Sequence, residues 1–84
     1  MFKIILKKKA QKFLEKTDKP TKERLANAIL DLKYAPLTGD IKKLSGKFLG
    51  ISRLRIGDSR VLFTRNESTQ KIIIYDINNR GDIY

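Results

Sequence analysis

Hydrophobic residues in the first part of the chain change from a strand pattern to a helical one. Phe2–Leu6 is a short, mostly apolar run of residues that favour β-structure, and it predicts a first strand. From about Lys8 the apolar positions recur at helical spacing, and the turn-forming segment Thr17–Pro20 ends this first helix. The helical stripe consists of Ala10, Phe13, Leu14 and Thr17.

A second helical stripe follows at once. Pro20 fits the first turn of a helix, where its missing N–H costs no hydrogen bond. The apolar positions at i, i+3, i+4 and i+7 are Leu25, Ala28, Ile29 and Leu32. We expect this helix to end near Tyr34, before Pro36. Because the connection is short, the two helices should form an antiparallel hairpin with their apolar faces on one side of a sheet.

The second half of the chain predicts strands. The three candidates are Leu49–Ile56, Arg60–Arg65 and Lys71–Ile77. Gly57–Ser59 joins the first two and Asn66–Gln70 the last two, and both links have hairpin length. Three consecutive strands with such links form an antiparallel meander.

Together these elements predict an α+β fold. It has an N-terminal strand, an antiparallel helix hairpin and a three-stranded antiparallel meander, with the helices packed on one face of a four-stranded sheet. The segments Pro36–Asp40 and Leu44–Gly46 are expected to be irregular connections. A chain of 84 residues has room for one compact core, so residues 1–84 are expected to form a single domain.

Strand alternation separates apolar from cationic side chains. Successive residues of a strand point to opposite faces, so four apolar residues fall on one face: Leu54, Ile56, Val61 and Phe63. If that face lies under the helices, Arg53, Arg55 and Arg60 gather on the open face. The pattern therefore predicts a cationic patch on rigid strands.

The net charge of +10 is shared equally by the two halves of the chain, but the residue types differ. Residues 1–40 carry nine of their ten positive charges as lysine, whereas residues 41–84 have five arginines among nine. Arginine presents a rigid fork that suits bidentate phosphate contacts. Nucleic acid or an acidic protein segment is the expected partner.

Two residue types are absent. Without cysteine there is no disulfide, thiolate nucleophile or thiolate metal ligand, and without histidine the commonest metal ligand and general base near neutral pH is missing. We expect no metal and no cofactor, and any catalysis must use Tyr, Lys, Arg or carboxylates. The absence of a secretory signal or a membrane-length apolar run predicts a cytoplasmic protein.

Two motifs resemble the RelE/ParE superfamily of toxins from type II toxin–antitoxin systems. Ser52–Phe63, read as SRLRIGDSRVLF, is similar to the family pattern aromatic-Arg-[Ile/Leu]-Arg-Val-Gly-Asp-Tyr-Arg-Val-[Leu/Ile]-Tyr. Ile77–Tyr84, read as INNRGDIY, is similar to its His-Arg-x-x-Val-Tyr ending. With the Leu44–Gly46 loop and the helix hairpin, the resemblance covers nearly the whole chain, closest to the RelE-like members.

For a RelE-like member the resemblance implies a ribosome-dependent, metal-independent endoribonuclease that cuts mRNA in the A site. The message's own 2′-OH attacks the adjacent phosphate, so the protein must supply cations and a proton acceptor. The residues carried over as phosphate and transition-state contacts are Arg53, Arg55, Arg60 and Arg80, with Tyr84 as general base or base-stacking residue. The implied partners are an acidic antitoxin, the ribosome and mRNA, with DNA reached only through an antitoxin complex.

Two other functions fit the same sequence. ParE-like toxins share the core pattern and inhibit DNA gyrase by binding, without a reaction of their own. A degenerate, non-toxic relative that binds only RNA or antitoxin is the third possibility. It would explain why Ser52 and Ser59 replace family aromatics, why Asn79 stands where His is frequent, and why no helix follows Tyr84.

Overall fold

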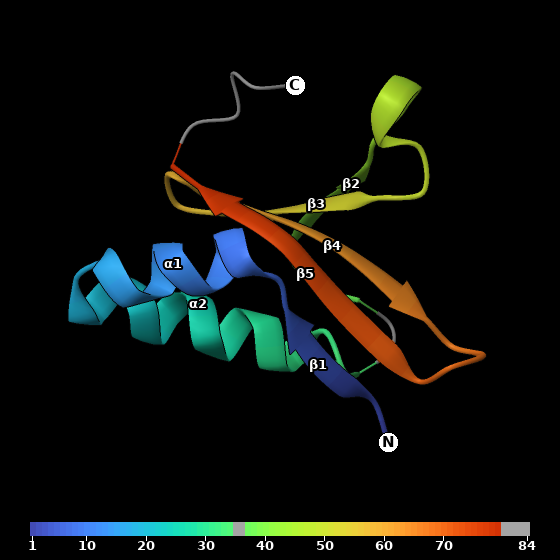
Figure 1. Cartoon of the computed structure of the whole chain (residues 1–84), viewed down its shortest axis with the longest axis horizontal. Helices are drawn as coiled ribbons and strands as arrows, with labels where there is room; N and C mark the ends of the chain where they lie inside the picture. The colour runs from blue at the N-terminus through green and yellow to red at the C-terminus, as the bar shows by residue number, and fades with distance from the viewer. Residues whose placement is uncertain (35–36, 80–84) are drawn as a thin grey trace.

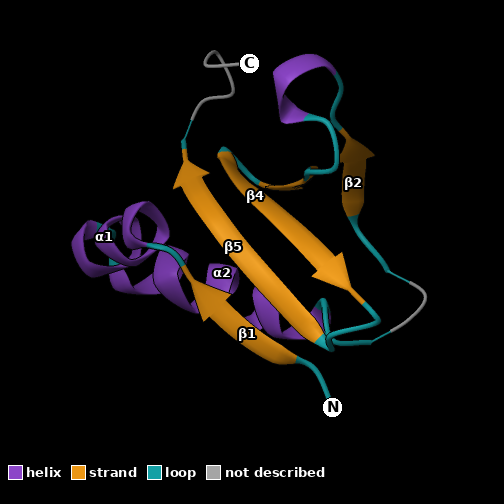
Figure 2. Cartoon of the chain, turned by 45° about the vertical axis from the view of Figure 1, so that its right-hand side comes forward, coloured by secondary structure: helices purple, strands orange, loops and turns teal. Residues whose placement is uncertain are grey.

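The computed structural model describes residues 1–34 and 37–79 (Figure 1). The elements in chain order are β1 (Lys3–Leu6), α1 (Lys8–Lys16), α2 (Lys19–Asp31), β2 (Asp40–Lys43), the short 3-10 helix η1 (Gly46–Phe48), β3 (Ser52–Ile56), β4 (Ser59–Asn66) and β5 (Lys71–Asn78). The predicted α+β arrangement is confirmed, with α1 and α2 on one side of a single sheet (Figures 1 and 2).

The strands lie in the order β1-β5-β4-β3-β2. Three neighbouring pairs are antiparallel, and β1 runs parallel to β5, with Ile4 opposite Ile72 and Leu6 opposite Ile74. The predicted meander corresponds to β3, β4 and β5. The helix hairpin links the edge strand β1 to the opposite half of the sheet. The first and last strands, β1 and β5, lie side by side (Figure 2).

The sheet has five strands, so the prediction of four was wrong by one. The additional strand is β2, which pairs antiparallel with β3 at the sheet edge, Ile41 lying opposite Leu54. Its sequence, DIKK, has one apolar residue and follows Gly39, so it carries no alternation that could be distinguished from a turn. An edge strand rich in charged side chains is a common way to avoid pairing with another chain.

Local capping explains where α2 begins. Asp18 has an extended backbone, and its carboxylate accepts hydrogen bonds from the backbone N–H and the hydroxyl of Thr21, both at 3.0 Å. Those hydrogen bonds hold the pKa of the Asp18 carboxyl below its ordinary value. Pro20 lies in the first turn, as predicted. The two helices are therefore joined by a tight turn at Thr17 and Asp18.

The core lies between the helices and one sheet face, and strand alternation predicted its composition. Its buried members are Ala10, Leu25, Ile29, Leu32, Leu54, Val61, Phe63, Ile72, Ile74 and Ile77, and Ile56 packs against them partly buried. Leu62, on the other sheet face, is also buried although it is not part of this core. The face opposite the helices therefore has an apolar residue at its centre.

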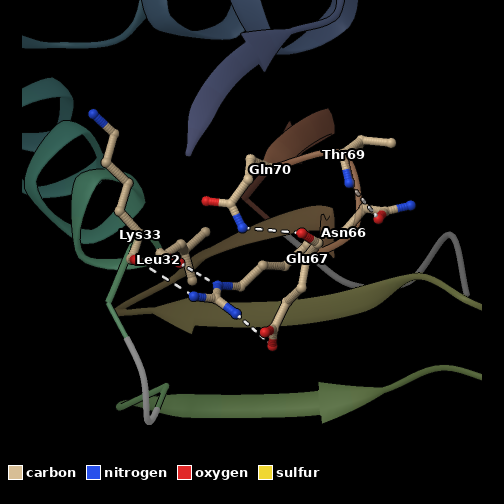
Figure 3. Close-up of polar contacts among 7 residues, drawn as sticks. Leu32, Lys33, Asn66, Glu67, Thr69 and Gln70 are labelled. Atoms are coloured by element: carbon tan, nitrogen blue, oxygen red, sulfur yellow. Dashed lines mark hydrogen bonds and ion pairs between the residues drawn. The ribbon is translucent and has the colours of Figure 1, made fainter. Parts of the chain in front are cut away.

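Arg65 links the end of α2 to the sheet through contacts with Leu32 and Lys33, which are labelled in Figure 3. Its guanidinium donates hydrogen bonds to the carbonyl oxygens of Leu32 at 2.9 Å and Lys33 at 3.3 Å, and it pairs with Glu67 at 3.1 Å. It also lies over the ring of Phe2, 4.0 Å from the centroid. Carbonyl groups at a helix C-terminus lack intrahelical hydrogen-bond donors, and Arg65 supplies donors to two of them. Arg65 therefore has a structural role.

Neither helix in the described part of the chain combines the length and the apolar character needed to cross a membrane.

Candidate functional site

The β3–β4 hairpin brings three arginines to the sheet face opposite the helices. Arg55 and Arg60 are direct cross-strand partners, and Arg53 lies two residues before Arg55, opposite Leu62. Partners in a ladder point to the same face, so the three side chains share the face that alternation predicted. Their positions depend on backbone pairing, which holds them on rigid strands.

Arg53 is the most enclosed of the three. Its side chain is 15% exposed and forms an ion pair with Asp40 of β2, Nη2 to Oδ1, at 3.0 Å. Its Nε is buried and has no hydrogen-bond partner among residues 1–34 and 37–79. A buried N–H without a partner is costly, so the position of the Arg53 side chain has a cost in stability.

Arg55 and Arg60 differ from Arg53 because neither forms an ion pair with a carboxylate among residues 1–34 and 37–79. Arg55 is exposed, and its Nε donates a long hydrogen bond of 3.4 Å to the carbonyl oxygen of Gly57. Arg60 is half-buried, and within the described residues it forms no ion pair and no side-chain hydrogen bond. Like charges directly opposite one another destabilise a sheet, and together they give this end of the β3–β4 hairpin a concentrated positive charge.

The end of β5 borders the arginines. Asn78 is the cross-strand partner of Arg60, and the nitrogen and oxygen of its side-chain amide are buried without a hydrogen-bond partner in the described part of the chain. Next to it, the amide oxygen of Asn79 accepts a hydrogen bond of 3.1 Å from the hydroxyl of buried Ser59. Two positions that depart from the family pattern, Ser59 and Asn79, are thus in contact with each other.

An open cleft of about 880 Å³ lies between the helix hairpin turn and the β3–β4 turn. Residues lining it are Thr17, Asp18, Thr21, Arg24, Leu25, Arg55, Ile56, Asp58, Ser59, Arg60 and Asn79. Three arginines and two aspartates give this lining a net positive charge. We refer to it below as the arginine cleft.

Arg24 was not among the site residues expected from the sequence. It extends from α2 into the arginine cleft, and its guanidinium packs on Gly57, whose added Cβ would lie 3.1 Å from Nη2. One sequence signal was available, because Arg24 is the only arginine among the ten basic residues of positions 1–40. Helical periodicity could not show that this exposed position faces a turn more than 30 residues later.

Arg80 and Tyr84 lie outside the described residues. Their expected roles as a phosphate contact and as a general base or base-stacking residue therefore stay predictions. Within the described ranges, no group of three or more carboxylate side chains could hold a metal ion, and the sequence has neither histidine nor cysteine.

The chemistry available in the described part of the site is electrostatic. Guanidinium groups on rigid strands can bind a phosphate and stabilise negative charge that develops on it, provided they are aimed before the reaction begins. Asn78 lies beside Arg60, but both polar atoms of its side-chain amide are buried. Asp18 also lines the arginine cleft, and the hydrogen bonds from Thr21 that lower the pKa of its carboxyl make it a weak base.

Neither a protein-family model nor a curated protein sequence matches the chain. Solved structures do. The RelE–RelB complex of the archaeon Pyrococcus horikoshii is similar with a TM-score of 0.79 and 28% identity, over 95% of this chain and 96% of that one. The RelBE2 toxin–antitoxin complex of Mycobacterium tuberculosis has a TM-score of 0.81 at 20% identity, over 94% and 98% of the two chains. The YoeB/ParE toxin of Agrobacterium tumefaciens has a TM-score of 0.79 at 19% identity, over 94% and 99%.

The structural likeness and the two sequence motifs agree. The structural likeness extends over nearly the whole chain, and the similar chains are themselves covered almost completely. The chain therefore has the RelE-like fold of the RelE/ParE toxin superfamily.

Proposed function

We propose that the protein is the toxin of a type II toxin–antitoxin system and that it cleaves mRNA in the ribosomal A site, in the cytoplasm. The observation that carries the proposal is the cross-strand pair Arg55–Arg60, two guanidiniums that form no ion pair within the described residues, at the motif that resembles the RelE-like pattern. The RelE-like fold supports the same assignment.

In the proposed reaction the 2′-OH of the message attacks the phosphorus of its own 3′-phosphodiester. The bond from phosphorus to the 5′-oxygen of the next nucleotide breaks, leaving a 2′,3′-cyclic phosphate and a free 5′-OH. The proton of the 2′-OH passes to a base, and the departing 5′-oxygen takes up a proton. Tyr84 is the proposed proton acceptor, made acidic enough by nearby arginines.

The arginines would stabilise the pentavalent phosphorane, whose charge exceeds that of the starting phosphodiester. Arg55 and Arg60 are the primary contacts in this proposal, and Arg80 acts beside them. Arg53 contributes when the phosphate replaces Asp40 as its ion-pair partner. Arg53 remains positively charged before and after this exchange. Such preorganised donors accelerate reactions because they need no reorientation as the charge develops.

We propose an acidic antitoxin as the protein partner. The positive net charge favours an acidic segment, and the exposed side chains of Leu37 and Leu49 lie on a second groove that also includes Ile73 and Tyr75. A segment with alternating acidic and apolar residues would match this surface and fold on binding. Ribosome and mRNA would compete with it for the arginines.

Mapping of cleavage sites on mRNA tests the reaction. The purified protein should cut a message inside the A-site codon in a translating extract and leave the same message intact when ribosomes are omitted. Absence of A-site products from the translating extract would show that the protein is not an mRNA interferase.

Gyrase inhibition is the second candidate, favoured by the likeness to the YoeB/ParE toxin of Agrobacterium tumefaciens. A DNA supercoiling assay separates the two functions. A gyrase poison traps cleaved DNA in that assay, whereas an mRNA interferase leaves supercoiling unchanged. If neither assay gives a signal and expression without antitoxin does not slow growth, the protein is a non-toxic relative.

A further inference from the structure

The arginine cleft is lined from two sides, and only one of them belongs to the strand motif. Arg55 and Arg60 reach it from the β3–β4 hairpin, whereas Arg24 reaches it from α2. The contact between the two sides is Gly57. Its carbonyl oxygen accepts the hydrogen bond from Arg55, and Arg24 packs where its side chain would be.

Gly57 makes this approach possible for two reasons. Its φ of +58° is left-handed, a conformation that glycine adopts without strain. A Cβ at this position would lie 3.1 Å from Nη2 and 3.7 Å from Cζ of Arg24, so a larger residue would push the guanidinium away. The turn glycine therefore allows the Arg24 guanidinium to pack against the same residue whose carbonyl oxygen accepts the hydrogen bond of Arg55.

Guanidiniums that line one cleft add their positive potentials, so the cleft attracts an anion unless nearby carboxylates neutralise it. Within the described residues Arg24 has no ion pair and no side-chain hydrogen bond, and Arg55 has only its long bond to Gly57. Asp18 lines the same cleft, but both of its described hydrogen bonds come from Thr21 at the helix start. Asp58, the other aspartate of the lining, forms no ion pair within the described residues. Neither of these two carboxylates therefore pairs with an arginine of the cleft in the described part of the chain.

We propose that Arg24 is an additional phosphate-binding residue, and that the RNA backbone passes through the arginine cleft between α2 and the β3–β4 hairpin. The proposal rests on the proposed function for the identity of the polyanion as RNA. Arg24 binds a phosphate next to the one held by Arg55 and Arg60, and so positions the strand. It does not contact the reacting atoms.

Binding of a non-cleavable RNA tests the proposal independently of catalysis. The probe is a fluorescein-labelled 2′-O-methyl RNA of ten nucleotides, titrated with the full chain by fluorescence anisotropy at several salt concentrations. Arg24→Gln should weaken binding by about 5- to 10-fold and reduce the slope of log K against log salt by about 0.7, the value for one phosphate contact with a single strand.

The matched control is Lys22→Gln, which removes one positive charge from the same helix at an exposed position that does not line the cleft. It should change affinity by less than about 2-fold, because a distant exposed charge is screened. Arg24→Lys keeps the charge without the fork and should recover part of the lost affinity. Equal affinities and salt slopes for Arg24→Gln and Lys22→Gln would overturn the proposal.

Two further comparisons distinguish mRNA from ribosomal RNA as the source of the phosphate, and distinguish failure of the Arg24 proposal from failure of the proposed function. Ribosome pelleting compares the binding of wild type and Arg24→Gln to ribosomes that carry a message truncated before the A-site codon. If the two proteins then bind equally, the phosphate belongs to mRNA. If Arg24→Gln still binds more weakly, the phosphate belongs to ribosomal RNA. If wild type fails to cut mRNA while Arg24→Gln still weakens oligonucleotide binding, the proposed function fails and the phosphate site stands. If wild type cuts mRNA while both variants bind alike, only the Arg24 proposal fails.

Discussion

Arg55 and Arg60 are direct cross-strand partners on β3 and β4, with no carboxylate paired to either of them in the described structure. Like charges opposite one another in a sheet lower the stability of the fold. The pair is therefore better explained by a role in binding an anionic ligand than by a role in stabilising the fold.

Neutralising one member of the pair should make the protein more stable. Arg60→Gln removes the repulsion with Arg55, and we expect the free energy of unfolding to rise by roughly 0.2–1 kcal/mol at low salt. The gain should shrink at high salt, where repulsion between the wild-type arginines is screened. Urea unfolding at two salt concentrations measures it. A loss of stability at both concentrations would mean that Arg60 holds the fold together.

Arg65 should show the opposite behaviour. Arg65→Met keeps the apolar part of the side chain but leaves the carbonyl oxygens of Leu32 and Lys33 without their donor, so we expect a loss of about 2–4 kcal/mol in the free energy of unfolding. Glu67→Gln is the control, because Glu67 is 77% exposed and such an ion pair contributes roughly 0–1 kcal/mol. Similar unfolding midpoints for the two variants would contradict a structural role for Arg65.

Asp40 should compete with phosphate for Arg53. Asp40→Asn removes the carboxylate that now pairs with Arg53, so RNA affinity should rise by up to about 5-fold, the equivalent of an exposed ion pair. Anisotropy with the non-cleavable RNA measures it. The double variant Arg53→Gln with Asp40→Asn should lose this rise in RNA affinity. If the rise persists in the double variant, Asp40 weakens RNA binding through its negative charge alone and not through its pairing with Arg53.

Asp18 gives the folded protein a defined dependence on acid. Hydrogen bonds from Thr21 lower the pKa of this carboxyl in the folded state, so its contribution to stability is complete above the ordinary pKa of 3.8 and is lost as the pH falls through the lower folded-state value. Asp18→Ala should therefore be less stable than wild type at pH 7, and the difference should narrow in acid. Urea unfolding from pH 7 to pH 2 follows it, and a constant difference would exclude the carboxylate as its source.

Periodicity in the sequence was sufficient for most of the fold. The stripe from Leu25 to Leu32 and the alternation through Leu54, Val61 and Phe63 each bury a continuous apolar face, so pattern and burial agree. The strand β2 could not be predicted, because its pairing with β3 depends on backbone hydrogen bonds that its polar side chains do not signal.

The site was predictable only where it lies on strands. Alternation is a local rule, and it correctly put Arg53, Arg55 and Arg60 on one face. The approach of Arg24 to Gly57 is a tertiary contact between a helix and a distant turn, which no local pattern reports. The pairing of Asp40 with Arg53 was not predicted either, because the sequence pattern did not indicate the strand that carries Asp40.

The single-turnover rate of A-site cleavage on programmed ribosomes tests the central claim most directly. Arg60→Gln should lower the rate by roughly 100-fold or more, as expected when a preorganised donor to developing charge is removed, while ribosome binding falls much less. Lys71→Gln is the matched control, because Lys71 is exposed at the start of β5, beside Asn66 at the far end of β4 from Arg60, and its rate should equal that of wild type. Equal rates for Arg60→Gln and wild type would contradict the assignment of the arginine pair as the site of the reaction.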